Sequence, residues 1–238
     1  MKTDWIEREV TGSSMRAYVA EPDEAPKAGV VVLQEIYGVN DFVRTIAEAV
    51  AGEGYLAIAP DLYHRTDPGL DLSRPEGQER GIAAALATTL PQIVADLTAS
   101  GAYLSERLGP EAQIGTWGFC FGGSIAFISA TLPFVRCAVS FYGGSIARSP
   151  VPDRPAWIEQ AREVRAPIFF AFGGADEHIS PEDHETIRKA LDGRSKHYEM
   201  HVLEGEGHAF FRLGPESNAG SREIWPRVQA FFARYLII

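Results

Sequence analysis

The segment GTWGFCFGG constrains the fold of this chain most, because it places Cys120 between two glycines directly after an apolar run. A strand that turns sharply into a helix holds its turn residue in strained backbone geometry, so the positions two before and two after it favour glycine. Gly118 and Gly122 occupy those positions. We therefore predict a strand over 114–118, a helix over 122–131, and the cysteine side chain raised clear of the sheet between them.

Apolar runs of strand length alternate with helix-length periodic segments along the rest of the chain, which is typical of an α/β protein. The predicted strands are Met15–Ala20, Gly29–Leu33, Tyr55–Ala59, Ile114–Gly118, Cys137–Tyr142, Ile168–Phe172 and His197–Leu203, and the further helices are Asn40–Gly52, Pro75–Leu90, 91–108, Pro181–Leu191 and Ser221–Tyr235. The segment Gly144–Pro155 contains three prolines and is interpreted as a surface loop. We therefore predict one domain over residues 1–238, with a mostly parallel sheet and helices on both faces.

Charge and cysteine content exclude several classes of function. Of 238 residues, 22 are Lys or Arg and 32 are Asp or Glu, which gives a formal net charge of −10. Such a surface repels phosphate backbones, so we expect no nucleic-acid partner, although a pocket can still carry a local positive field for a small anion. Cys120 and Cys137 lack the ligand spacing of a structural zinc site, and no GxGxxG follows the first long strand. We therefore expect neither a metal nor a cofactor.

The sequence holds no apolar stretch of the roughly 18–20 residues that a bilayer requires. Its first ten residues carry charges where a signal peptide is apolar. We therefore expect a cytoplasmic protein with free thiols and no membrane partner, as a monomer or small homo-oligomer. Cys137 is interpreted as a buried core residue.

Cys120 is the candidate nucleophile, because the amino end of a helix favours an anion and gives a cysteine there thiolate character. An α/β-hydrolase arrangement then needs an acid and a histidine, in that order along the chain. Asp176 and His208 each follow a predicted strand, so all three are expected at one edge of the sheet. Glu177 is the competing acid. The other histidines, His64, His178, His184, His197 and His201, are interpreted as surface or strand residues.

Four stretches of the sequence resemble the dienelactone hydrolase (carboxymethylenebutenolidase) family. They are LQEIYGVN at 33–40, APDLY at 59–63, GFCFGG at 118–123 and GEGHAFF at 205–211. The cysteine in the turn is more distinctive than the rest, since serine is usual at that position of the fold. The resemblance covers most of the chain and implies an α/β-hydrolase fold in which Cys120, Asp176 and His208 form the catalytic triad.

The resemblance also implies roles for other residues. Glu35 matches a glutamate that contacts the resting thiol and helps to deprotonate it, and Ile36 and Phe121 match residues whose backbone N–H groups form an oxyanion hole. Arg80 and Arg212 resemble two arginines that bind a substrate carboxylate. A buried structural role for Glu35 and plain surface roles for the arginines remain open. Aromatic side chains that line the cavity or fill the core are Tyr37, Phe119, Phe121 and Tyr142.

The chemistry of sulfur limits the substrate. A thiolate is also a good leaving group, so it is expelled again unless the other group on the tetrahedral carbon departs at least as easily. Enol esters and enol lactones meet this condition, because their enolate collapses to a ketone. We therefore predict hydrolysis of a small activated ester or lactone, carboxylate-bearing like dienelactone, through a thioester on Cys120. Ala209 stands where the family often has serine, which leaves the particular substrate open.

Two alternatives remain from the sequence. The first is a broad esterase or thioesterase of the same fold, in which Arg80 and Arg212 have no role. The second is a thiol redox sensor or binding protein on the same scaffold, in which Cys120 is oxidised.

Overall fold

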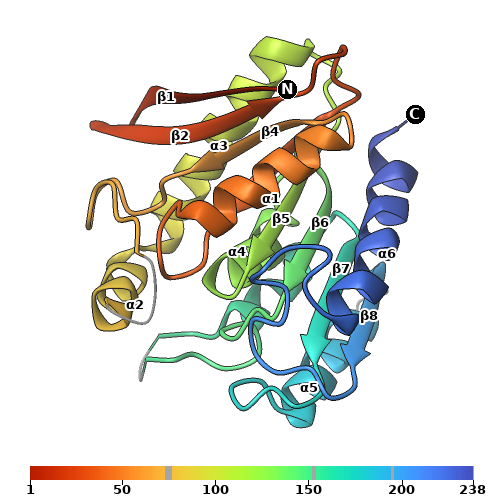
Figure 1. Ribbon diagram of the computed structural model, residues 1–238. Helices are drawn as coiled ribbons and strands as arrows, with labels where there is room; N and C mark the ends of the chain where they lie inside the picture. Colours follow the sequence, from red (N-terminus) through yellow and green to blue (C-terminus); the bar gives the residue numbers. More distant parts are fainter. Residues whose placement is uncertain (73–76, 152–153, 194–195, 238) are drawn as a thin grey trace. The chain divides into compact units, whose positions relative to one another are not determined.

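The computed structural model describes residues 1–72, 77–151, 154–193 and 196–237. They form two compact units, Met1–Gly115 with Ile237, and Thr116–Leu236. Figure 1 shows the strands and helices of each unit. Pro75, where a helix was predicted to begin, and Pro152 of the predicted loop lie outside the described residues. The single domain over 1–238 stays a prediction.

The strands of the first unit follow the spatial order β1-β2-β4-β3. β1 (Lys2–Val10) and β2 (Ser13–Glu21) pair antiparallel across a turn at Thr11–Gly12, where both residues have positive φ. β2 is antiparallel to β4 (Leu56–Pro60), and β3 (Gly29–Leu33) runs parallel to β4. Every residue of β3 and β4 is buried, as their continuous apolar runs predict.

The sequence analysis missed β1. Five of its nine residues are charged and most are exposed, so it lacks the apolar pattern of a core strand. It pairs with β2 on one side only, and charges on such an edge strand discourage pairing with a second molecule. The strand forms because β2, which a two-residue turn joins to it, supplies a complete ladder of backbone partners, and the residue pattern of β1 itself does not show this pairing.

Three helices pack within the first unit. α1 (Asp41–Gly52) begins at Asn40, whose side chain accepts a hydrogen bond from the Val43 N–H at 3.2 Å. α1 contacts β2, β3 and β4, whereas α3 (Leu90–Leu108) contacts β1, β3 and β4. Figure 1 shows α1 in front of these strands and α3 behind them, so both faces are covered as predicted. α2 (Gln78–Ala87) ends earlier than predicted, because Thr88 is extended.

Within the described ranges, no single helix is long and apolar enough to cross a membrane. Only α2 and α3 taken together reach that length and composition, and they are bent by 92° relative to each other.

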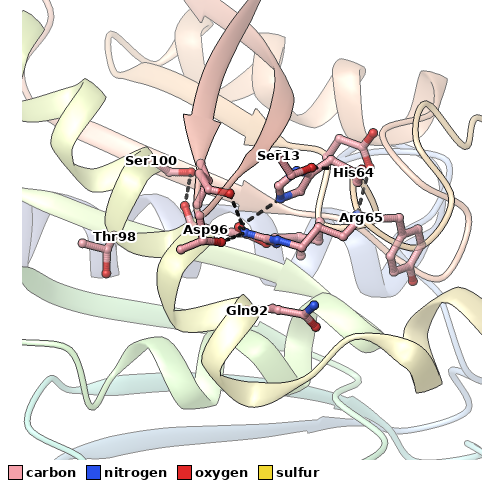
Figure 2. A network of polar contacts seen from close by, with 12 residues as sticks. Ser13, His64, Arg65, Gln92, Asp96, Thr98 and Ser100 are labelled. Atoms are coloured by element: carbon pink, nitrogen blue, oxygen red, sulfur yellow. Dashed lines mark hydrogen bonds and ion pairs between the residues drawn. The ribbon is translucent and has the colours of Figure 1, made fainter.

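A buried polar network fixes three parts of the first unit to one another (Figure 2). Asp96 of α3, which is fully buried, accepts from both Nη1 and Nη2 of Arg65 at 3.0 and 2.9 Å. His64 Nε2 lies 3.1 Å from the same carboxylate, and its Nδ1 lies 2.9 Å from Oγ of Ser13 at the start of β2. The interpretation of His64 as a surface or strand residue is therefore wrong, since it lies buried in a turn after β4.

The strands of the second unit follow the order β5-β6-β7-β8. β7 (Ile168–Gly173) runs parallel to β6 (Val135–Phe141) and to β8 (Tyr198–Leu203), as expected for strands joined by helices. β5 (Ile114–Phe119) begins in the last two residues of the first unit. The parallel part of the sheet was therefore predicted within one or two residues at each end.

Helices cover the strands of the second unit. α4 (Phe121–Ser129) contacts β6, and α6 (Ala219–Leu236) contacts β6 and β7. α5 (Pro181–Asp192) packs against η1 (Trp157–Glu163), a 3₁₀ helix that follows the predicted proline-rich loop and was not predicted.

The core of the second unit is aromatic. The ring of Trp117 lies 5.0 Å from that of Phe119 and 5.4 Å from those of Phe141 and Trp225. Phe119 is fully buried among these rings, which supports the interpretation that it fills the core. Cys137 is fully buried as well, as predicted, and burial raises the pKa of its thiol.

Candidate active site

The predicted turn at Cys120 is present. β5 ends at Phe119, α4 begins at Phe121, and Cys120 between them has φ 52° and ψ −111°, in the left-handed half of the map that side chains rarely adopt. A Cβ on Gly118 would lie 1.9 Å from the carbonyl oxygen of Gly122, so this position accepts only glycine. The turn is held by a hydrogen bond from the Cys120 N–H to the Phe141 carbonyl at 3.0 Å.

Cys120, His208 and Asp176 lie together in the second unit. His208 Nε2 is 3.3 Å from Cys120 Sγ, and its Nδ1 is 2.8 Å from Asp176 Oδ2. An ionised carboxylate only accepts hydrogen bonds, so Nδ1 carries a proton and Nε2 faces the sulfur. In this arrangement His208 can exchange a proton with the thiol while Asp176 fixes its orientation.

Electrostatics favour a protonated His208. Burial works to lower its pKa, but the hydrogen bonds to Asp176 and Cys120 raise it to about 10. Burial works to raise the pKa of Asp176, but the bond from His208 and two backbone N–H groups hold it below its ordinary value. The Asp176 side chain is fully buried and that of His208 is 19% exposed. The two groups are therefore arranged to stabilise an imidazolium beside a carboxylate.

Glycine at the end of β7 brings the acid loop and the histidine loop together. A Cβ on Gly173 would lie 2.4 Å from the carbonyl oxygen of Glu206 and 2.6 Å from that of Gly207. The Ala175 N–H donates to the same Glu206 carbonyl at 2.8 Å. This close backbone contact places Asp176 and His208 within hydrogen-bond distance. Gly173 and Gly174 are visible in the sequence before Asp176, but the contact was not predicted.

Two aromatic rings contact the His208 ring. Tyr142 lies edge-to-face at 5.2 Å between centroids, and His178 lies edge-to-face at 5.0 Å. Tyr142 is fully buried and has φ 39°, a strained value for a residue with a side chain. His178 is exposed, as predicted, but its position against His208 was not foreseen.

The remaining histidines have varied environments. His197 is exposed and His201 lies on β8, as predicted. The interpretation of His184 is wrong, because it is a buried residue of α5 that stacks on Phe172 at 4.5 Å. Helical periodicity placed α5 but did not reveal which of its polar residues faces inward.

Glu35 and Ile36 follow β3 in the first unit. Glu35 is fully buried, so it is not an ordinary solvated charge. The carbonyl oxygen of Ile36 would lie 2.1 Å from a Cβ on Gly81, which fits α2 closely against this segment. Phe121, the other predicted oxyanion residue, is the first residue of α4 in the second unit. The roles predicted for these residues stay predictions.

The two predicted carboxylate-binding arginines lie on different elements. Arg80 is on α2, one residue before Gly81, and its side chain is 61% exposed. Its Nε and Nη2 donate to the two carboxylate oxygens of Asp67, so this edge of the guanidinium already holds an anion. Arg212 follows His208 in a turn in which its N–H donates to the Ala209 carbonyl at 3.0 Å. Substrate binding by either residue stays a prediction.

Among the residues that the structure describes, no group of three or more His, Cys, Asp or Glu side chains could hold a metal ion.

Cys120 at a strand-to-helix turn, with Asp176 and His208 on loops after later strands, is the arrangement of the α/β-hydrolase fold. The chain belongs to the dienelactone hydrolase family, whose model matches residues 15–236. It is 36% identical over 223 residues to a protein of Synechocystis sp. provisionally named carboxymethylenebutenolidase, covering 90% of this chain and 89% of the relative.

Two further proteins extend the comparison. The chain is 31% identical over 212 residues to carboxymethylenebutenolidase of Pseudomonas putida, covering 88% of this chain and 86% of the relative. A solved structure from Klebsiella pneumoniae, provisionally named dienelactone hydrolase, superimposes with a TM-score of 0.85 at 29% identity, over 99% of this chain and all of the other.

Proposed function

We propose that this protein hydrolyses small activated esters or enol lactones through a thioester on Cys120. The observation that carries the proposal is the line of atoms from Cys120 Sγ through both nitrogens of His208 to Asp176 Oδ2, with separations of 3.3 and 2.8 Å. Membership of the dienelactone hydrolase family supports the reaction class.

In the proposed first step, Cys120 Sγ attacks the carbonyl carbon as a thiolate while His208 holds the proton. The carbonyl oxygen becomes an oxyanion, for which the backbone N–H groups of Ile36 and Phe121 are the proposed donors. When the oxyanion collapses, the C–O bond to the enolate breaks, and the enolate takes a proton from His208 and becomes a ketone. The acyl group remains on sulfur as a thioester.

In the second step, His208 takes a proton from water, which attacks the thioester carbon. The C–S bond breaks, the carboxylic acid leaves and Cys120 regains its thiolate beside a protonated His208. Asp176 stabilises the imidazolium in both steps. From the family resemblance we propose that Glu35 assists thiol deprotonation and that Arg80 and Arg212 bind a substrate carboxylate.

Rapid mixing with a chromogenic enol ester tests the proposal. A burst of product, together with an acyl adduct on Cys120 in the mass spectrum of quenched protein, is expected. Cys120→Ala should abolish both signals. An inactive wild-type protein that forms a sulfenic acid on Cys120 under mild peroxide would instead support the redox sensor.

Comparison of an anionic with a neutral substrate tests the proposed specificity. Arg80→Ala and Arg212→Ala are expected to raise KM for dienelactone and to leave KM for a neutral activated ester of similar size unchanged. Equal effects on both substrates would remove the carboxylate-binding role and favour a broad esterase.

A further inference from the structure

His178 contacts the proposed catalytic histidine without a hydrogen bond to it. Its ring centroid lies 5.0 Å from that of His208, and the two planes meet at 87°. Both nitrogens of His208 are already engaged, Nδ1 by Asp176 and Nε2 by Cys120. His178 therefore acts on the carbon edge or the face of the His208 ring, where it can hold the ring but cannot exchange a proton with it.

The two rings that contact His208 differ in exposure. Tyr142 contacts the His208 ring and is fully buried, so it forms the inner support. His178 contacts the same ring and is itself exposed, so His208 contacts one buried ring and one exposed ring. A hydrogen bond is electrostatically stronger where water is excluded. A ring that keeps water from the Nδ1–H···Oδ2 bond would therefore strengthen it.

The backbone of His178 is fixed by groups on both sides of it. Its N–H donates to Asp176 Oδ1 at 2.8 Å, so a single carboxylate orients both histidines. Its carbonyl oxygen accepts from Arg148 Nη2 at 3.4 Å. Arg148 is in turn held by both carboxylate oxygens of Asp183 at 2.6 Å. These bonds fix the point at which the His178 side chain leaves the backbone, beside the His208 ring.

We propose that His178 is a positioning residue for His208: its ring holds the imidazole in line between Asp176 and Cys120 and keeps water from the bond to Asp176. The kinetic consequence rests on the proposed function, whereas the protection of the hydrogen bond does not. Proton transfer depends on alignment, so loss of the ring slows the chemical steps more than it weakens substrate binding.

Hydrogen exchange at His208 Nδ1 tests the protection without any turnover. The downfield Nδ1 proton is assigned by nitrogen-15 NMR from its absence in His208→Gln. Its exchange with water is expected to accelerate about tenfold in His178→Ala, because an exposed site exchanges faster than a covered one. His178→Phe keeps a ring at the position and should restore slow exchange. The exposed residue His197, varied as His197→Ala, is the matched control.

Steady-state kinetics with a neutral activated ester test the alignment. In His178→Ala, kcat is expected to fall on the order of tenfold with KM almost unchanged. His178→Phe should recover most of the loss, and His197→Ala should have the activity of the wild-type protein.

Several outcomes would overturn the proposal. Unchanged Nδ1 exchange in His178→Ala would show that His178 does not cover the bond. A rise in KM at constant kcat would make His178 a substrate contact. Failure of His178→Phe to rescue a correctly folded protein would show that the ring itself is not what matters.

If Cys120→Ala remains active, the proposed function fails, but the exchange measurement still decides the role of His178.

Discussion

Cys120, Tyr142 and Ala209 have φ values of 52°, 39° and 59°, although each has a side chain. Such conformations cost on the order of 1–3 kcal/mol each and persist where the surroundings enforce them. Hydrogen bonds enforce the first two, from Cys120 N–H to the Phe141 carbonyl and from Tyr142 N–H to the Ala171 carbonyl at 2.8 Å. Thr11, in the turn between β1 and β2, is also strained, but these three residues lie at or beside the proposed triad.

The raised pKa of His208 gives a prediction for Asp176→Asn. Since the imidazolium persists up to a pKa of about 10, the alkaline limb of kcat/KM should fall at about that pH. The hydrogen bond to Asp176 helps to raise this pKa, so its loss should move the alkaline limb toward neutral pH and lower kcat. The measurement is a pH–rate profile with a neutral ester, corrected by a Cys120→Ala blank.

Glu177→Gln is the matched control for this measurement, because Glu177 is the competing acid and lies next to Asp176 in the chain. It should leave the alkaline limb in place. If the alkaline limb shifts in Glu177→Gln but not in Asp176→Asn, the acid is Glu177 and the assignment of Asp176 is wrong.

At the scale of elements, a backbone contact joins the loop after β7 to the loop after β8. The carboxyl end of β7 lies against the Glu206–Gly207 backbone, so the distance from Asp176 to His208 is set by two main-chain segments. A methyl group at Gly173 has no room there.

Gly173→Ala should therefore separate the two loops. Overpacking of this kind costs about 1–3 kcal/mol of stability, and misalignment of the triad should lower kcat on the order of a hundredfold. Chemical denaturation and kinetics on the same preparation measure both effects. Gly52→Ala is the control, because its Cβ would meet nothing within 4 Å at the end of α1. A fully active Gly173→Ala would contradict the proposed cause of the alignment.

The buried network around Asp96 gives a second prediction at this scale. Asp96→Asn leaves the Arg65 guanidinium without its carboxylate partner, which should lower the free energy of unfolding by about 3–5 kcal/mol. The exposed pair of Arg8 with Glu106 is the control, and Glu106→Gln should lower the free energy of unfolding far less, because water screens an exposed pair. Urea denaturation followed by circular dichroism compares the two variants. Equal losses would mean that burial of the network contributes nothing extra.

Elements with local patterns were predictable from the sequence, and contacts between distant segments were not. The apolar run of β3 and the glycines around Cys120 carry their own structural signal. β1 carries none, because a charged edge strand looks like a solvated segment. That Cys120, Asp176 and His208 lie together was predictable because each follows a strand. The contact of His178 with His208 was not, since it depends on how two loops meet.

At the scale of the whole molecule, the net charge of −10 opposes the approach of an anionic substrate. Repulsion by the whole protein would make kcat/KM rise with salt, whereas attraction by local arginines would make it fall. If Arg80 and Arg212 bind the substrate carboxylate as proposed, kcat/KM for dienelactone should fall between about 10 and 300 mM ionic strength, because their field would act at close range.

A neutral activated ester should show almost no salt dependence in the same series. The double variant Arg80→Ala/Arg212→Ala should reverse the slope for the anionic substrate. If the dependence of kcat/KM on ionic strength is the same with and without the two arginines, the overall charge of the protein determines it.

Because Arg80 is already paired with Asp67, an anion can bind this side of Arg80 only by replacing the Asp67 carboxylate. A ligand that takes the Nε–Nη2 edge displaces a carboxylate attached to the same chain, and the number of ion pairs is equal before and after. The Asp67 carboxylate is attached to the same chain and therefore has a high effective concentration at Arg80, so a freely diffusing monoanion competes poorly with it. Only a ligand that a second group of the protein also binds can displace the Asp67 carboxylate from Arg80.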